Sequence, residues 1–179
     1  QESRGLGDVY KRQLFSPDTE LGRWLATRNT MLRIGRNLFV HAGLSARLLE
    51  RNLEMDTLNA RMSEGLYRTS KERREDPTLE FLYRSAGPVW YRGMVCTDEK
   101  YDPLTPEQTD ALLRRYDADR LLIGHTIFPD ISTFHDGRVI AVNVQNERNR
   151  RKNRGRAVLI EGSRISVVGN RGVKRVLEE

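Results

Sequence analysis

The sequence predicts an α/β fold in which buried strands alternate with helices and a β-meander ends the chain. The apolar run 38–40 leads directly into His41, and the apolar run 121–123 leads through one glycine into His125. Strands of this kind carry a polar side chain to one edge of a sheet. Between them lie charged segments with apolar residues at helical spacing, and these segments predict helices.

The composition is that of one globular domain with a highly charged surface. The chain has 179 residues, of which 37% are hydrophobic and 31% charged, and its formal net charge is +6. This length is sufficient for a single domain with a core. No apolar run approaches the length of a membrane span and no signal peptide is recognisable, so we expect no membrane segment and take the cytoplasm as the default location. The single cysteine, Cys96, excludes a disulfide within the chain.

The first residues are interpreted as foreign to the fold. Residues 3–13 show no amphipathic pattern and match the translation of an adapter used in sequencing libraries. We therefore assign residues 1–13 to an adapter-derived artefact and residues 14–179 to the domain. On this interpretation the natural protein begins upstream of Leu14, and the chain is its C-terminal part.

The first segments of the domain predict two strands framed by helices. Ser16-Pro17 is a typical helix start, because a capping hydroxyl precedes a proline at the first helical position. Residues 30–34 alternate in polarity as a strand does, and a glycine-containing turn leads from them into the strand 38–41. Ser45 is expected to cap a further short helix.

The middle of the chain predicts helices with many charges. Residues 56–85 have a helical pattern that Pro77 divides into two helices, and the mixed-charge run 71–76 is interpreted as a solvated linker. Thr105, with a proline after it and Gln108 three positions on, is a capping-box helix start.

The last third predicts short antiparallel strands. Asp136-Gly137 is a hairpin-turn signal between the strands 131–134 and 138–142, so His135 is expected to be a turn residue rather than a ligand. Further strands are expected at 157–160, 165–168 and 173–176. These strands form the predicted β-meander.

The two histidines at matching strand ends suggest one shared site. Neutral imidazole is the commonest metal-ligating side chain, and the small residues Ala42 and Gly43 after His41 let the backbone pass close to whatever the ring contacts. Position alone leaves metal ligation and a hydrogen-bonded structural role equally open for His41 and His125. We expect the two rings to converge in one crevice.

Three segments carry a resemblance to a known family. Residues 39–45, FVHAGLS, resemble the VHGGLS segment of the calcineurin-like metallophosphoesterases, in particular the serine/threonine phosphoprotein phosphatase branch. Residues 122–126, LIGHT, resemble their GHT segment, and residues 87–93, GPVWYRG, resemble the GPxWYRG segment of bacterial-type members. The order of the segments also agrees, and the resemblance extends from about Leu14 to the C-terminus.

The resemblance implies hydrolysis of phosphate monoesters by a two-metal centre. It makes His41 and His125 metal ligands, with two divalent ions as cofactors, Mn or Fe ahead of Zn. Arg92 is the candidate catalytic residue, because a guanidinium can bind two phosphate oxygens at once; a surface salt bridge is the alternative role for Arg92. The expected partner is a phosphorylated substrate, such as a phosphoprotein.

The resemblance also implies that the chain supplies only part of the site. The family fold is a β-sandwich flanked by helices, and this chain would be its C-terminal portion only. The DxH and GNH segments that supply further ligands in the family do not occur in this sequence. Two imidazoles cannot hold a two-metal centre, so we expect the chain alone to be inactive.

Two other functions remain open from the sequence. The run from Arg148 to Arg154 could make the chain a basic nucleic-acid-binding module. No aromatic residues interleave with this run, so it offers no stacking platform, and we favour a solvated hairpin loop and no nucleic-acid partner. The chain could also be a non-catalytic structural domain whose histidines only satisfy the core.

Overall fold

The computed structural model describes residues 10, 13–152, 154–172 and 174–178. Within these residues the chain forms two β-sheets and a set of helices, so the predicted α/β class is confirmed. The segment 1–13, interpreted as an adapter artefact, lies outside the described residues except for Tyr10 and Gln13. No helix of the described residues has the length and apolarity needed to cross a membrane.

The larger sheet has five strands in the order β1-β2-β3-β5-β4. β2, β3 and β5 run parallel, and β1 and β4 are antiparallel strands at the two edges. The strands are β1 (Met31–Ile34), β2 (Asn37–Val40), β3 (Arg120–Ile123), β4 (Ser132–Phe134) and β5 (Val139–Ala141). The register pairs Val40 with Ile123 and Ile123 with Ala141, so the carboxyl ends of the three parallel strands lie together.

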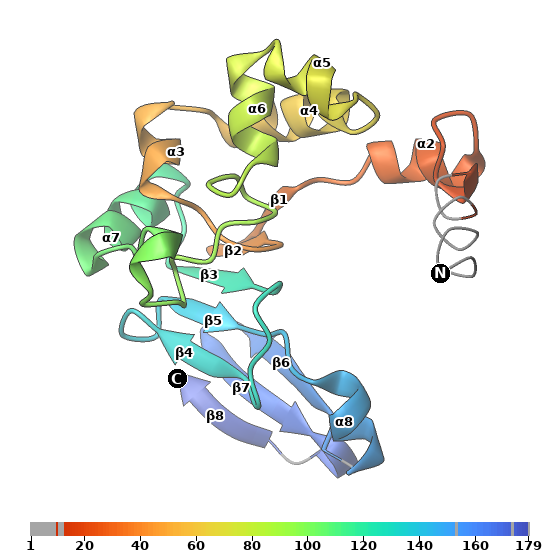
Figure 1. Cartoon of the computed structure of the whole chain (residues 1–179). Coiled ribbons are helices and arrows are strands. Elements are labelled where there is room, and N and C mark those ends of the chain that lie inside the picture. The colour runs from red at the N-terminus through yellow and green to blue at the C-terminus, as the bar shows by residue number, and fades with distance from the viewer. Residues whose placement is uncertain (1–9, 11–12, 153, 173, 179) are drawn as a thin grey trace.

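The helices pack mainly against one face of this sheet (Figure 1). Because side chains alternate across a strand, Leu38 and Leu121 point to this face while Phe39 and Leu122 point to the other. The main core joins this face to α3, α4, α6 and α7. The helices are α2 (Glu20–Ala26), α3 (Ala46–Glu50), α4 (Met55–Gly65), α5 (Ser70–Arg74), α6 (Pro77–Tyr83), α7 (Pro106–Arg115) and α8 (Asn146–Arg151), with short 3-10 turns at η1 (Glu99–Tyr101) and η2 (Asn170–Gly172).

The smaller sheet is the predicted C-terminal meander. β6 (Arg156–Glu161), β7 (Arg164–Gly169) and β8 (Lys174–Glu178) pair antiparallel in chain order. Ile165 and Val167 of β7 are buried in a second apolar cluster with Leu122 and Ile140 of the larger sheet. The two sheets therefore contact each other through the face of the larger sheet that the helices leave free.

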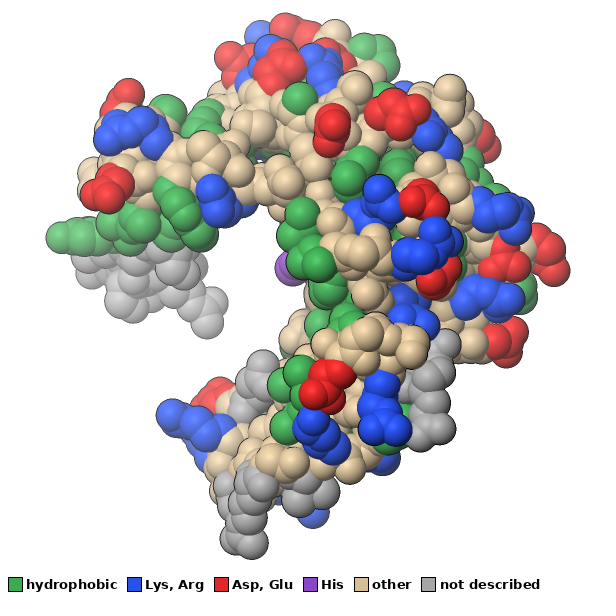
Figure 2. All heavy atoms as spheres, turned by 180° about the vertical axis from the view of Figure 1, so that it is seen from behind, with side chains coloured by type: hydrophobic (Ala, Val, Ile, Leu, Met, Phe, Trp, Pro, Cys, Tyr) green, Lys and Arg blue, Asp and Glu red, His purple; other side chains and the backbone are tan. Residues whose placement is uncertain are grey.

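Part of that second face is not covered by the described residues. A hollow of about 560 Å³ is lined by apolar side chains that include Leu32, Phe39 and Leu122, with His41 at its edge. Leu32 stays 42% exposed although it lies on a strand. Figure 2 shows hydrophobic side chains gathered around this concave surface, with a histidine beside them.

Three local predictions were wrong. The helix predicted to start at Ser16 begins instead at Glu20, with Thr19 as its N-cap, because the turn that starts at Ser16 folds back over Gly22. The run 71–76 is not a linker, since most of it belongs to α5, which Thr69 and Glu72 close with a capping box. The first part of the basic run 148–154 lies in the short helix α8 (Asn146–Arg151) rather than in a hairpin loop.

Candidate active site

The two strand-end histidines meet at the carboxyl edge of the larger sheet. β2 and β3 are adjacent and parallel, and the backbone N–H of Gly124 continues their pairing by donating to the His41 carbonyl at 2.8 Å. Nε2 of His41 lies 3.2 Å from Nδ1 of His125, and the ring centroids are 5.1 Å apart. The expected convergence of the two rings is confirmed.

The backbone at His125 is held in an unusual conformation. His125 has φ +59°, in the left-handed region that residues other than glycine seldom adopt. The N–H of Thr126 donates to the Gly124 carbonyl at 2.6 Å, which closes a three-residue turn around the histidine. Such strain costs on the order of 1–3 kcal/mol and persists where the surroundings enforce it. Here the pairing of β2 with β3 fixes the position from which the turn starts.

The surroundings of His125 favour its neutral form. Its pKa is lowered by burial first, then by the positive charge of Arg92 and by His41. The second ring nitrogen, Nε2, is buried and has no hydrogen-bond partner among the described residues. A buried polar atom without a partner is uncommon in proteins and is explained by strain, by a catalytic role or by a bound water or ion. The Nε2 atom of His125 is therefore a candidate functional group of the site.

The loop 87–93 brings an arginine and a tryptophan to this edge. Its carbonyl at Pro88 accepts from the backbone N–H of Ala42 at 3.0 Å, one residue after His41. The Trp90 ring stands perpendicular to the His125 ring at 5.5 Å between centroids. Nη1 of Arg92 donates to the Thr126 hydroxyl at 3.1 Å. The loop thus places a cation and an aromatic wall beside the imidazole pair.

Arg92 is not neutralised by a carboxylate in the part of the chain that the structure describes. Its hydrogen bond is to Thr126, and no ion pair of its guanidinium is recorded there. The alternative role of Arg92 in a surface salt bridge therefore finds no partner among these residues. A half-buried guanidinium without a counter-ion is well suited to bind an anion.

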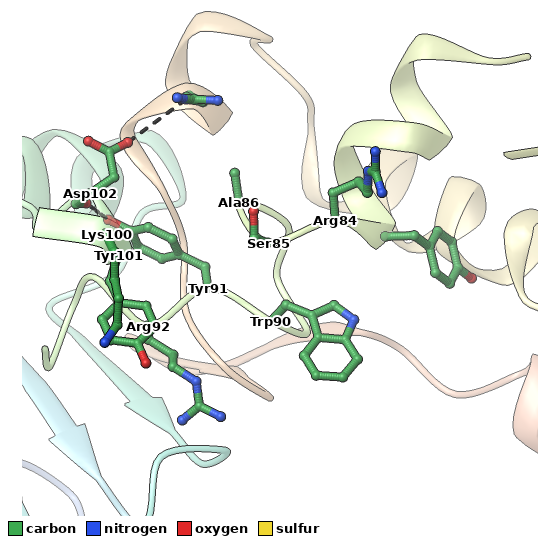
Figure 3. A pocket seen from close by; sticks show the side chains of 11 residues that line it. Arg84, Ser85, Ala86, Trp90, Tyr91, Arg92, Lys100, Tyr101 and Asp102 are labelled. Atoms are coloured by element: carbon green, nitrogen blue, oxygen red, sulfur yellow. Dashed lines mark hydrogen bonds and ion pairs between the residues drawn. The ribbon is translucent and has the colours of Figure 1, made fainter. Parts of the chain in front are cut away.

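A cavity of about 580 Å³ adjoins the site on the side of Trp90 and Arg92. Its lining includes four cationic side chains, one carboxylate, and the aromatic rings of Tyr83, Trp90, Tyr91 and Tyr101. Figure 3 shows Trp90 and Arg92 leaving the loop on the same side. The Tyr91 hydroxyl donates to the Asp102 carbonyl, and burial raises the pKa of Tyr91 well above its usual value. Tyr91 is thus a buried structural member of the wall.

The third histidine is structural. His135 lies in the turn between β4 and β5, as predicted, and it also has a positive φ, 52°. Its Nδ1 lies 3.2 Å from the Thr109 hydroxyl and its Nε2 lies 3.0 Å from the Met94 carbonyl. Both ring nitrogens therefore have partners, and the ring ties the turn to α7 and to the loop after Arg92.

The predicted pair of divalent ions does not fit the described residues. His41 and His125 meet, but no group of three or more His, Cys, Asp or Glu side chains in the described part of the chain is arranged to hold a metal ion. Zinc sites in proteins have three or four protein ligands, and a pair of ions needs more. The two-metal cofactor, Mn, Fe or Zn, inferred from the resemblance is therefore wrong for this set of residues.

The comparisons with known proteins point to a phosphatase fold. No family model matches the chain, and no curated protein matches it. Three solved structures have a TM-score of 0.81 and 28% sequence identity over 92% of this chain. They are a cold-active protein tyrosine phosphatase, a point mutant of such an enzyme, and the cold-active protein-tyrosine phosphatase of a psychrophile, a Shewanella species. The chain is similar in fold to protein tyrosine phosphatases.

This similarity changes the family that the sequence suggested. The neighbours are described as protein tyrosine phosphatases, so a phosphatase fold is supported, while the assignment to the calcineurin-like metallophosphoesterases and their β-sandwich is not. The chain spans only 46–47% of the length of these solved chains. What the whole enzyme does is therefore a proposal for this chain.

Sequence reasoning missed several residues of the site. Thr126 follows His125 directly, but nothing in the sequence indicates that its hydroxyl accepts from Arg92, which lies 34 positions earlier. The edge-on contact of Trp90 with His125 depends on the same long-range placement of the loop 87–93. The signal that could have directed attention to both is the segment 87–93, which carries the tryptophan and the arginine between two glycines.

Proposed function

We propose that the chain is the phosphoryl-binding part of a phosphate-monoester hydrolase that acts on phosphotyrosine in proteins. The observation that carries this proposal is the match to solved protein tyrosine phosphatases, at 28% identity and a TM-score of 0.81 over 92% of the chain. The site supports it, because Arg92 and the pair of histidines lie together at one sheet edge.

In this proposal Arg92 binds the phosphoryl group. Its planar guanidinium can donate to two phosphoryl oxygens, and its partial burial reduces the competition from water. The hydrogen bond to Thr126 uses one of its N–H groups and limits the directions in which the others point. The affinity for the substrate therefore depends on one cation held in a defined orientation.

The two histidines handle protons in this proposal. His125 is kept neutral, and its Nε2 is free to hydrogen-bond to a phosphoryl oxygen or to the oxygen of the leaving group. His41 is exposed and shares a proton with His125 across the 3.2 Å contact, so it connects the buried ring to solvent. A neutral imidazole beside bound phosphate suits proton transfer near neutral pH.

The experiment is a titration of the full chain with phosphotyrosine, measured by calorimetry and accompanied by a phosphate-release assay on a phosphotyrosine peptide. Arg92→Gln should weaken binding at least about tenfold, because it removes a charge-assisted hydrogen-bonding group. Arg114→Gln, which removes an exposed cation of α7 outside the site, is the matched control and should bind as the parent does. We expect slow hydrolysis, since the chain covers 46–47% of the solved enzymes' length.

Equal affinity of the parent and Arg92→Gln for phosphotyrosine would contradict the proposal. So would the complete absence of binding, because the proposal places a phosphoryl-binding group, Arg92, in this chain. The competing nucleic-acid function has little support from the described residues: on α8, Arg151 pairs with Glu147, and no arginine of that helix is recorded over an aromatic ring.

A further inference from the structure

The cavity beside the site has the composition of a surface that binds acidic polypeptide. Its lining has four cationic side chains, Arg47, Arg84, Arg92 and Lys100, against one carboxylate, Asp102. Its volume of about 580 Å³ lies within the ~300–1,000 Å³ range typical of ligand sites. Aromatic rings line the rest, so an occupant would meet both apolar walls and positive charge.

Three of the four cavity cations already have carboxylate partners, and an incoming anion would have to replace them. Arg47 and Asp102 form an ion pair at 3.8 Å inside the cavity, and they largely cancel. Arg84 and Lys100 have carboxylate partners that do not line the cavity, Glu80 at 3.5 Å and Asp98 at 2.6 Å. Exposed pairs of this kind are weak and exchange readily with other anions.

The cavity is continuous with the proposed phosphoryl site, because Trp90 and Arg92 belong to both. Figure 3 shows Arg84 at one end of the cavity and Lys100 at the other, with Tyr91 between them. A residue whose phosphoryl group is bound by Arg92 would therefore place its neighbours in the polypeptide near these two cations. Neutral or basic neighbours would gain no favourable charge interaction with these two cations.

We propose that this cavity selects substrates with acidic residues next to the phosphorylated residue, and that Arg84 and Lys100 determine this specificity. The inference rests on the proposed function for the position of the phosphoryl group. The inference differs from the proposed function because it concerns the residues that flank the phosphorylated residue. These are recognised by their charge, in a place separate from the imidazole pair. Neither cation touches the reacting atoms, so both act on substrate choice.

The test uses the full chain and four fluorescently labelled peptides, in a two-by-two design. Two peptides contain phosphotyrosine and two contain tyrosine, and within each pair the flanking residues are either acidic or serine and glycine. Fluorescence polarisation at low and at physiological salt gives the affinities. Acidic flanks should tighten binding about three- to tenfold with or without the phosphoryl group, and salt should reduce this advantage.

Two sets of variants assign the effect to the cavity. Arg84→Gln with Lys100→Gln should abolish the advantage of acidic flanks, and Arg84→Lys with Lys100→Arg should retain it. Arg114→Gln removes a charge outside the cavity and should leave the advantage unchanged. All three positions are exposed, so the fold should survive, which an unfolding curve checks.

The design separates this inference from the proposed function. Equal affinity for acidic and neutral flanks, or an advantage that persists in the double glutamine variant, would overturn the inference. The phosphotyrosine and tyrosine peptides could instead bind with equal affinity while acidic flanks still tighten binding. That result would overturn the proposed function and leave the cavity as a site for acidic peptides. Absence of binding by every peptide would overturn both.

Discussion

Gly87 is the position at which a single methyl group should disturb both the fold and the site. An ideal Cβ at Gly87 would lie 2.0 Å from the carbonyl oxygen of Leu82 and 2.8 Å from that of Phe81. Both atoms belong to the backbone at the end of α6, so no side-chain rotation can relieve the contact. Gly87→Ala therefore forces the loop and the helix end apart by more than an ångström.

The magnitude follows from the contacts that this movement breaks. Overpacking a fixed site costs about 1–3 kcal/mol. The N–H of Gly87 donates to Arg84, and its carbonyl accepts from Trp90 and Tyr91; each such hydrogen bond contributes about 1 kcal/mol. Overpacking together with the loss of one of these three hydrogen bonds gives a total of about 2–4 kcal/mol, which for a chain of this size lowers the melting temperature by about 5–15 °C.

The assay is thermal unfolding followed by circular dichroism, combined with the phosphotyrosine titration. Gly124→Ala is the comparison variant, because its added Cβ would lie 3.2 Å from the His41 carbonyl and needs only a small adjustment. It should lose about 1 kcal/mol or less. Phosphotyrosine binding should weaken in Gly87→Ala, since the loop carries Arg92. A melting temperature within about 2 °C of the parent for Gly87→Ala would refute the reasoning.

Two further predictions concern a buried phenol and the orientation of the arginine. Burial raises the pKa of Tyr116 to about 12. The folded state thus holds this proton more tightly than the unfolded state, so stability is complete below about pH 10 and falls as the pH rises towards 12. Urea unfolding at pH values across this range should show that the free energy of unfolding falls less with rising pH in Tyr116→Phe than in the parent. Tyr10→Phe, which changes a tyrosine that is 74% exposed, should behave as the parent does. The same dependence of the unfolding free energy on pH in Tyr116→Phe and in the parent would contradict this prediction. Thr126→Val should weaken phosphotyrosine binding about fivefold, because Arg92 loses its acceptor, and Thr126→Ser should restore the affinity measured by calorimetry; equal affinities would exclude a positioning role.

The sequence predicted the parts of the fold that depend on local pattern. The apolar runs before His41 and His125 are buried strands because alternate residues fill the two faces of a sheet. The start of α7 was predicted because Thr105 and Gln108 are close in sequence and cap each other. A capping box of the same kind at Thr69 and Glu72 starts α5. The residues after Thr69 are nearly all charged and show no apolar face, so the run was interpreted as a linker.

The parts that were not predicted depend on distant partners. Ser45 was expected to cap α3 with its side chain, but its hydroxyl is buried and donates to the Ala86 carbonyl, 41 positions away. Three of the four cavity cations come from α3, from the residue after α6 and from η1, and each of these three looks like an ordinary surface residue in its own segment. No local pattern could indicate that Arg84 and Lys100 face one space.

A comparison of His125 with His135 separates function from structure. Both histidines have a positive φ and both are half-buried, so both carry the same cost of backbone conformation. His135 offsets this cost with hydrogen bonds from both ring nitrogens, to Thr109 and to Met94. His125 has one such contact, to His41, and its buried Nε2 adds a second cost instead of a compensation. A residue that carries backbone strain and leaves a buried ring nitrogen without a partner among the described residues is poorly explained by stability, which agrees with the functional role proposed for His125.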